Sequence, residues 1–210
     1  RRGADGRAAG GDPALTVRTF PDACDFLFPR TASGIKWGLE TTGALLAALG
    51  HPERHFPVVH VAGTHAKGST TTMLYEVLRA AGWRVGLYTS PHLVSFRERM
   101  VVDGVPIPEA ALVEWTERLR PLAEERQASF FEITTAIACA DFASRSVDVA
   151  VVEVGLGGRL DATNVLQPLV SGETRIALEH TDYLGPDLAS IAREKPAIAK
   201  PGVPFVTTEP

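Results

Sequence analysis

The stretch VVHVAGTHAKGSTTTMLYEVLRAAGWRVGLY, residues 58–88, decides the fold. It begins with a short apolar run, residues 58–61, that is typical of a buried parallel strand. A loop rich in glycine and hydroxyl groups follows, and residues 70–81 then predict a helix. Apolar residues recur along that helix at helical spacing: Met73, Leu74, Val77 and Leu78. Residues 84–88 return as a second strand. The stretch therefore predicts a βαβ unit whose loop opens onto the N-terminus of a helix.

The loop of this unit has the composition of a phosphate-binding site. Backbone N–H groups of a glycine loop and of the first helical turn point at one spot, where the helix dipole favours negative charge. Lys67 could reach the outer phosphates of a nucleotide, and a nearby hydroxyl could approach Mg²⁺. The pattern GxxxxGK[ST] is not met, because Ala66 precedes the lysine and Gly68 follows it. An ordinary glycine-lined turn is the alternative, but the flanking strand and helix favour phosphate binding.

Composition excludes several classes of protein. The 210 residues are 45% hydrophobic, enough for one sizeable core and too few for two full α/β domains. A net charge of −4 leaves no broad basic field for nucleic acid or a membrane surface, and no apolar run approaches the roughly 18–20 residues of a membrane span. Cys24 and Cys139 form no metal-binding cluster, so we expect a reduced, cytoplasmic setting. We expect residues 1–12 to be a disordered leader and residues 13–210 to form one domain.

An acidic residue lies near the end of a second buried strand, predicted at residues 147–154. Glu153 is followed by the glycine-rich loop 155–158. A carboxylate at the end of a buried strand, beside a phosphate loop, is where an α/β sheet would hold Mg²⁺; the alternative is that Glu153 only caps the strand. Further helices are predicted at 39–49, 108–126, 134–145 and 186–195, and further strands at 100–102, 169–178 and 203–207. This alternation predicts a parallel sheet with right-handed crossovers.

Six motifs in order resemble the folylpolyglutamate synthase/dihydrofolate synthase family, which is related to the Mur ligases. They are HVAGTHAKGST (60–70), TSPHL (89–93), FFEITTAIA (130–138), EVGLGGRLDATN (153–164), EHTDYLG (179–185) and IAREKPAIAKPG (191–202). The resemblance covers about residues 28–207. It implies an α/β fold with a parallel-sheet P-loop domain like the central domain of Mur ligases. It also implies that this domain is incomplete here and that a C-terminal Rossmann-like domain is absent from the chain.

The resemblance implies an ATP-dependent amide ligase of folate biosynthesis. In that family ATP phosphorylates a substrate carboxylate, and the amine of L-glutamate attacks the acyl phosphate. The implied substrates are ATP, L-glutamate and either dihydropteroate or a reduced folate, with Mg²⁺ as the cofactor. We expect a monomer that binds neither nucleic acid nor a membrane, and we expect this chain alone to be inactive.

Residue roles follow from the same resemblance. The implied ATP-binding residues are Gly63, Thr64, His65, Ala66, Lys67, Gly68, Ser69 and Thr70. The implied magnesium ligands are Ser90, Glu153, His180 and Lys195, the last as a carbamate, with Lys67, His180 and Lys195 counted as catalytic. The pterin-bearing substrate is expected against Arg97, Phe130 and Phe131, because aromatic faces can stack a pterin and arginine can pair with a carboxylate. The alternatives are that Lys195 is a solvated lysine and that the two phenylalanines belong to the core.

Several positions depart from the family pattern. His65 and Ala66 stand where asparagine and glycine are usual, Glu179 replaces aspartate, and Gly172-Glu173 interrupts an apolar strand. A Cβ at residue 66 could crowd a position that glycine fills because of positive φ. Two other functions therefore remain as alternatives. One is another P-loop kinase or GTPase, for which the usual GK[ST] and NKxD segments are missing. The other is a non-catalytic paralogue or inactive fragment that binds nucleotide or folate.

Overall fold

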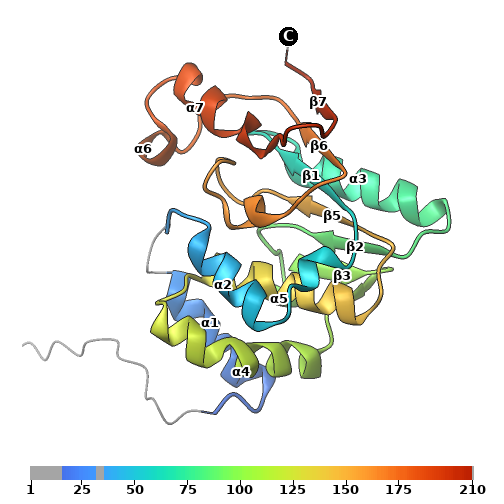
Figure 1. The fold of residues 1–210 in the computed structure, drawn as a ribbon, viewed down its shortest axis with the longest axis vertical. Helices are drawn as coiled ribbons and strands as arrows, with labels where there is room; N and C mark the ends of the chain where they lie inside the picture. The colour runs from blue at the N-terminus through green and yellow to red at the C-terminus, as the bar shows by residue number, and fades with distance from the viewer. Residues whose placement is uncertain (1–15, 32–35, 210) are drawn as a thin grey trace, which may run out of the picture.

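The computed structural model describes residues 16–31 and 36–209, which form an α/β layered fold around one sheet (Figure 1). The seven strands of the sheet lie in the order β4-β3-β2-β5-β1-β6-β7. Their bounds are β1 Val58–Ala62, β2 Val85–Tyr88, β3 Met100–Val102, β4 Val105–Pro106, β5 Val149–Glu153, β6 Val170–Glu173 and β7 Phe205–Thr207. The predicted parallel sheet is confirmed for five neighbouring strands, from β2 to β7 in that order. Strands β3 and β4 add an antiparallel edge.

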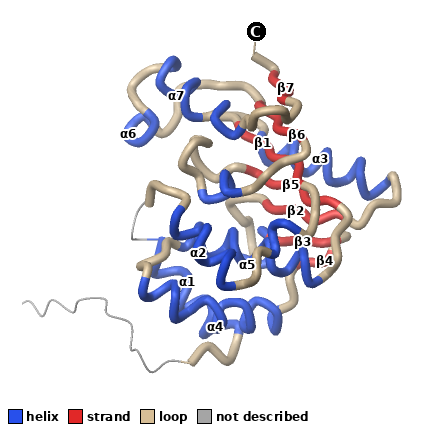
Figure 2. Tube along the Cα trace, viewed as in Figure 1, coloured by secondary structure: helices blue, strands red, loops and turns tan. Residues whose placement is uncertain are grey.

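Helices cover the two faces of the sheet unequally (Figure 2). The helix α3 lies alone on one face, whereas α2 and α5 lie on the other, with α1 and α4 outside them. The short helices α6 and α7 lie at the same end of the molecule as β6 and β7. The helix bounds are α1 Phe20–Leu27, α2 Glu40–Ala48, α3 Lys67–Ala80, α4 Glu109–Glu125, α5 Phe130–Ser144, α6 Thr181–Leu184 and α7 Leu188–Glu194.

The helix α3 presents a different face to the sheet from the one that its apolar spacing indicates. Thr71 and Tyr75 are the buried residues of this helix. The Tyr75 hydroxyl accepts a hydrogen bond from Gly104 N at 2.6 Å, which ties the helix to the β3–β4 turn. Met73 and Val77 are 60% and 66% exposed, and Leu74 is exposed as well. The apolar spacing therefore predicts the helix but does not mark its buried face, and of the four residues only Leu78 packs against the core.

The helix α5 begins four residues earlier than the predicted 134–145. Ser129 is its N-cap, and the Ser129 side chain accepts from Glu132 N while the Glu132 carboxylate accepts from Ser129 N at 2.7 Å. This capping box fixes the start at Phe130. Because α5 packs between the sheet and the outer helices, nearly all of its side chains are buried. The cap thus sets the direction of the two phenylalanines at the start of the helix.

The leader at residues 1–12 lies outside the described residues. Across residues 16–31 and 36–209, no helix is long and apolar enough to cross a membrane. Both cysteines are free, with Cys139 buried in the core.

Candidate functional site

Three parts of the predicted site come from the carboxyl ends of neighbouring parallel strands. The glycine loop follows β1, Glu153 is the last residue of β5, and Ser90 follows β2. Strand β1 lies between β5 and β6, so Glu153 and Glu173 flank the end of β1. This is the edge at which open α/β sheets bind their ligands. The sheet order therefore brings together residues that are about a hundred positions apart in the sequence.

The predicted phosphate-binding loop, residues 63–69 and called the phosphate loop below, contains two residues with positive φ. Gly63 has φ 141°, and a Cβ at this position would lie 1.9 Å from Thr174 Oγ1, so no other residue fits without a shift. Ala66, the N-cap of α3, has φ 62°, as expected for a position where glycine is favoured. The helix begins at Lys67 and Thr70 N donates to Ala66 O. The amides of residues 67–69 therefore lie in the first turn, where the helix supplies no carbonyl partner.

Not every residue predicted to bind ATP lies next to the free amides in the first turn of α3. The Thr64 hydroxyl donates to Ala177 O and accepts from Ala177 N, both at 3.1 Å. The amides of Thr64 and His65 donate to Arg175 O. These two residues therefore hold the loop against the segment after β6, whereas the amides of residues 67–69 are the ones placed to meet an anion.

Two lysines converge on a single carbonyl of the loop. Lys67 Nζ and Lys195 Nζ each donate to Gly63 O at 2.9 Å. Lys195 also donates to Glu179 Oε1 at 2.5 Å. Lys195 is only 1% exposed, so the alternative interpretation of a solvated lysine is wrong. Burial lowers the pKa of Lys195, and Glu179 opposes this shift. Burial would raise the pKa of Glu179, but the hydrogen bond and charge of Lys195 outweigh it, and the net shift is downward.

Glu153 is a buried carboxylate beside the phosphate loop. It is 4% exposed, and its Oε2 accepts from Ser90 N at 2.9 Å. A Cβ on Gly68 would lie 3.6 Å from both of its carboxylate oxygens, which places the first turn of α3 against this side chain. Burial raises the pKa of Glu153, while the Ser90 amide, Lys67 and Arg99 act in the opposite direction.

The residues present fit a magnesium ion in part. Ser90 and Glu153 supply hard oxygen atoms, which Mg²⁺ prefers, and the ion commonly takes one or two carboxylates together with substrate phosphates. No group of three or more His, Cys, Asp or Glu side chains is placed to hold a metal in the described ranges. His180 is exposed and follows Glu179 directly. The Lys195 amine is engaged as a hydrogen-bond donor, and its carbamylation stays a prediction.

A cavity of about 480 Å³ opens next to Ser90. Its walls contain both aromatic side chains that the sequence singles out, Phe130 and Phe131. Phe130 is 6% exposed and belongs to the main core cluster as well, so the core and cavity interpretations both hold for it. Phe131 packs against the core and lies so close to Gly155 that a Cβ there would meet its ring at 2.4 Å.

The arginine of this cavity is not the one that the sequence indicates. Arg97 Nε donates to Ile107 O at 2.6 Å and its guanidinium pairs with Glu109, so Arg97 does not line the cavity. Arg99 does line it. The Arg99 guanidinium lies 5.1 Å from the centre of the Phe130 ring, and its Nε donates to His92 Nδ1 at 2.9 Å. The two arginines are two residues apart, and only the turn Phe96–Arg99 decides which of them faces the cavity.

Other cavity residues carry no strong signal in the sequence. They include two cations, two partly exposed aromatic residues and one buried acid: Arg30, Lys36, Trp37, Tyr183 and Asp161. The motif EVGLGGRLDATN contains Asp161, so position within the motif was the one available signal for it. Arg30 and Trp37 lie beside residues 32–35, which the structure does not describe.

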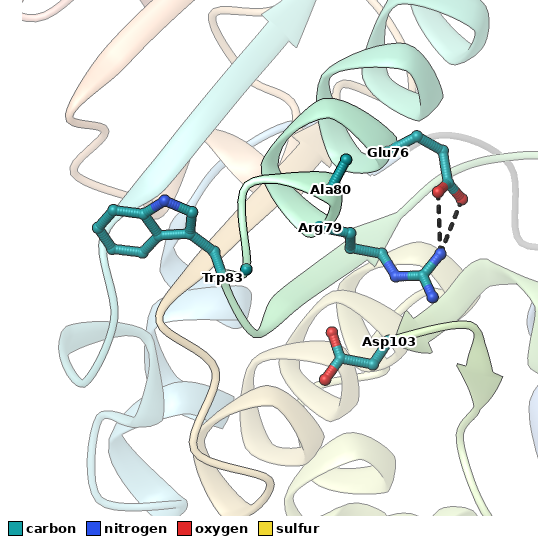
Figure 3. A pocket seen from close by; sticks show the side chains of 6 residues that line it. Glu76, Arg79, Ala80, Trp83 and Asp103 are labelled. Carbon is teal, nitrogen blue, oxygen red and sulfur yellow. Dashed lines mark hydrogen bonds and ion pairs between the residues drawn. The ribbon is translucent and has the colours of Figure 1, made fainter.

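A second hollow lies at the other end of α3 (Figure 3). Glu76, Arg79, Trp83 and Asp103 line it. Its charges already have partners, since Arg79 Nη1 donates to both oxygens of Glu76 and Asp103 Oδ1 accepts from Val85 N at 3.1 Å. The first of these contacts lies within α3 and the second within the sheet region, so the charges of this hollow are already paired and we do not take it as a candidate site.

Comparison with known proteins gives a consistent set of relatives. No family model matches the chain. A probable bifunctional folylpolyglutamate synthase/dihydropteroate synthase of Halobacterium salinarum is 46% identical over 195 residues, covering 90% of this chain and 24% of that protein. The dihydrofolate synthase/folylpolyglutamate synthase of Bacillus subtilis is 40% identical over 195 residues, covering 90% of this chain and 45% of that protein. The chain thus spans less than half the length of these relatives.

A solved structure has the same fold. E. coli FolC in complex with DHPP and ADP superposes with a TM-score of 0.87 at 39% identity, over 93% of this chain and 47% of that one. An FPGS–AMPPCP complex gives a TM-score of 0.83 over 90% of this chain. The shared fold and the identity over nine-tenths of the chain agree with the six sequence motifs. The chain belongs to the folylpolyglutamate synthase/dihydrofolate synthase family and corresponds to the N-terminal portion of its members.

Proposed function

We propose that this chain supplies the phosphate-binding and folate-binding part of an ATP-dependent ligase that joins L-glutamate to dihydropteroate, to a reduced folate, or to both. The reaction passes through an acyl phosphate, as the resemblance implies. Nucleotide-bound and DHPP-bound relatives of the same fold support the choice of substrates. A monomeric, cytoplasmic protein is part of the same proposal.

The phosphate loop would bind the outer phosphates of ATP. A substrate carboxylate attacking a phosphoryl group is one anion attacking another, so positive charge must surround the reacting atoms. The Lys67 ammonium and the first-turn amides of α3 supply that charge. Ser90 and Glu153 would hold Mg²⁺, which neutralises phosphate charge when bound. In this role Lys67 would exchange its bonds to the loop carbonyls for bonds to phosphate oxygens.

The cavity would hold the pterin-bearing substrate. Phe130, Phe131, Trp37 and Tyr183 offer aromatic surface on which a planar ring system can stack. Arg99 is placed to pair with a carboxylate, since its partner His92 uses only Nε. A ligand with a planar ring at one end and a carboxylate at the other matches this combination.

The observation that carries the proposal is the position of Ser90. Its amide holds Glu153 at 2.9 Å, and the same residue lines the cavity. The phosphate site and the cavity therefore meet at one residue. Formation of an acyl phosphate requires that meeting, because the substrate carboxylate must reach the γ-phosphate.

The test is L-glutamate-dependent formation of ADP by the full-length gene product. Dihydropteroate and tetrahydrofolate are offered separately with Mg-ATP. Turnover with dihydropteroate alone identifies a dihydrofolate synthase, and turnover with both identifies the bifunctional enzyme. No turnover with either by a folded protein contradicts the proposal. We expect no turnover by the 210-residue chain alone.

A specific observation keeps the non-catalytic paralogue as a second candidate. Ala66 holds φ 62° at the position that determines the shape of the phosphate loop, and its Cβ stands beside the amides that would meet the nucleotide. Binding of Mg-ADP without turnover by the full-length product favours the paralogue. Measurable turnover excludes it.

A further inference from the structure

A buried histidine in the central strand breaks the usual rule for polar groups in a core. His60 of β1 is 0% exposed, and its Nδ1 has no hydrogen-bond partner within residues 16–31 and 36–209. Its Nε2 lies 2.8 Å from Thr163 Oγ1. An unpartnered buried nitrogen destabilises a fold, and an apolar side chain of similar size would avoid that loss. Such local conflicts are expected where a residue serves the site.

The hydrogen bonds around Thr163 fix the direction of each proton. The single hydroxyl proton of Thr163 is donated to Asp161 Oδ1 at 2.5 Å. Thr163 Oγ1 can then only accept from His60, so His60 Nε2 carries the proton and Nδ1 does not. Burial lowers the pKa of His60 to about 3, so the ring is neutral and has one proton to give. The opposite tautomer would draw the Thr163 proton toward His60 and away from Asp161.

Asp161 is the end of this chain of hydrogen bonds and lies in the wall of the cavity. It is 5% exposed. Besides the Thr163 hydroxyl, it accepts from Thr163 N at 3.0 Å and from Leu156 N at 2.8 Å. These three donors hold the carboxylate in one orientation, and because a carboxylate offers about four acceptor sites it can still accept from a ligand. The Thr163 hydroxyl is the one donor whose direction depends on another side chain.

We propose that His60 is a positioning residue: through Thr163 it keeps the Asp161 carboxylate oriented as an acceptor for N–H groups of the ligand in the cavity. The inference rests on the proposed function only for the identity of that ligand. The positioning role itself concerns His60, Thr163 and Asp161 and can be measured without ligand.

The first experiment is amide hydrogen exchange of the 210-residue chain, followed by NMR. The amides of Leu156 and Thr163 report on Asp161, because both donate to its carboxylate. In His60→Leu we expect both to exchange about fivefold faster, the factor that corresponds to the loss of about one hydrogen bond. The amide of Val154, which donates to Val61 O in the sheet, is the internal control. His60→Gln places an N–H near the position of Nε2 and should restore slow exchange.

A second pair of variants separates positioning from stability. Thr163→Val keeps the shape of the side chain and removes the hydroxyl, so it should behave like His60→Leu, and Thr163→Ser should behave like the wild type. The ¹⁵N shifts of His60 should show the Nε2–H tautomer in the wild type. Unchanged exchange at both reporter amides in His60→Leu and Thr163→Val overturns the proposal, as does an Nδ1–H tautomer.

The ligand experiment is calorimetric titration of the chain with dihydropteroate. We expect His60→Leu and Thr163→Val to bind about tenfold more weakly, and the glutamine and serine variants to recover most of the affinity. Wild-type affinity in both His60→Leu and Thr163→Val overturns the positioning role and leaves the proposed function intact. If the wild type binds no dihydropteroate, the proposed ligand is wrong, and the exchange experiment alone decides the role of His60.

Discussion

Replacement of Ala66 by glycine tests whether the phosphate loop is strained. Ala66 is exposed and holds φ 62° and ψ 12°. A residue with a Cβ in this left-handed conformation lowers the free energy of unfolding by about 1–2 kcal/mol. Glycine lowers it by about 0.4–1 kcal/mol, because a glycine gives the unfolded chain more conformational freedom. The difference predicts that Ala66→Gly raises the free energy of unfolding by roughly 0.5–1 kcal/mol, or the melting temperature by about 1–4 °C for a chain of this size.

The matched control lies at the other end of the same helix. Ala80 is exposed and helical, so Ala80→Gly should lower the free energy of unfolding by about 0.5–1 kcal/mol. Thermal and urea denaturation of the two variants should therefore give shifts of opposite sign. Mg-ADP should also bind Ala66→Gly more tightly, because backbone amides approach a phosphate more closely at glycine. If Ala66→Gly is destabilised as much as Ala80→Gly, the argument from φ is refuted.

Three further predictions concern burial, packing and specificity. The raised pKa of Glu153 means that the unfolded chain releases this proton at a lower pH, near 4.5, than the folded protein does. The free energy of unfolding of the wild type therefore falls as pH rises above that value. Glu153→Gln should raise the melting temperature more at pH 7 than at pH 4, and it should lose Mg-ADP binding. Equal gains in melting temperature at both pH values would contradict this. A Cβ on Gly158 would lie 2.5 and 2.6 Å from two carbonyl oxygens at the end of α7. Gly158→Ala should therefore lower the free energy of unfolding, measured by urea denaturation, by about 2 kcal/mol. The control Gly43→Ala, in open space within α2, should gain about 1 kcal/mol. Arg99→Lys should weaken dihydropteroate binding about tenfold in calorimetry, with Arg97→Lys close to wild type; the reverse order would restore Arg97 as the ligand-binding arginine.

The sheet and its order of elements follow from the sequence to a large extent. The buried strands at β1 and β5 are short, apolar and β-branched, and such runs have few other stable arrangements. The antiparallel strands β3 and β4 have only three and two residues, so their pairing depends on the Asp103-Gly104 turn more than on periodicity. Residues Gly172 and Glu173 look like a break in the sequence, yet β6 continues through them, because pairing with strands on both sides outweighs local propensity.

The candidate site is predictable only in part. The loop, Glu153 and Lys195 stand in long motifs, so their places in the chain could be read directly. The choice between Arg97 and Arg99 depends on a short turn that no periodicity reveals. The buried face of α3 does not follow from the sequence, because its buried residues, Thr71 and Tyr75, lie outside the apolar set. The pairing of Glu179 with Lys195 is a contact between loops and leaves no local pattern in the sequence.

The contact between Lys195 and the carbonyl of Gly63 has a consequence for the order of folding. These two residues are separated by 132 positions, so their hydrogen bond closes a loop that spans most of the chain. Contacts of such long range form late, because the entropy of loop closure is lost before they stabilise anything. During synthesis, α3 and the strands β1 and β2 that flank it in sequence leave the ribosome long before Lys195 does. Capacity to bind nucleotide should therefore appear only after the α7 segment has been translated and docked.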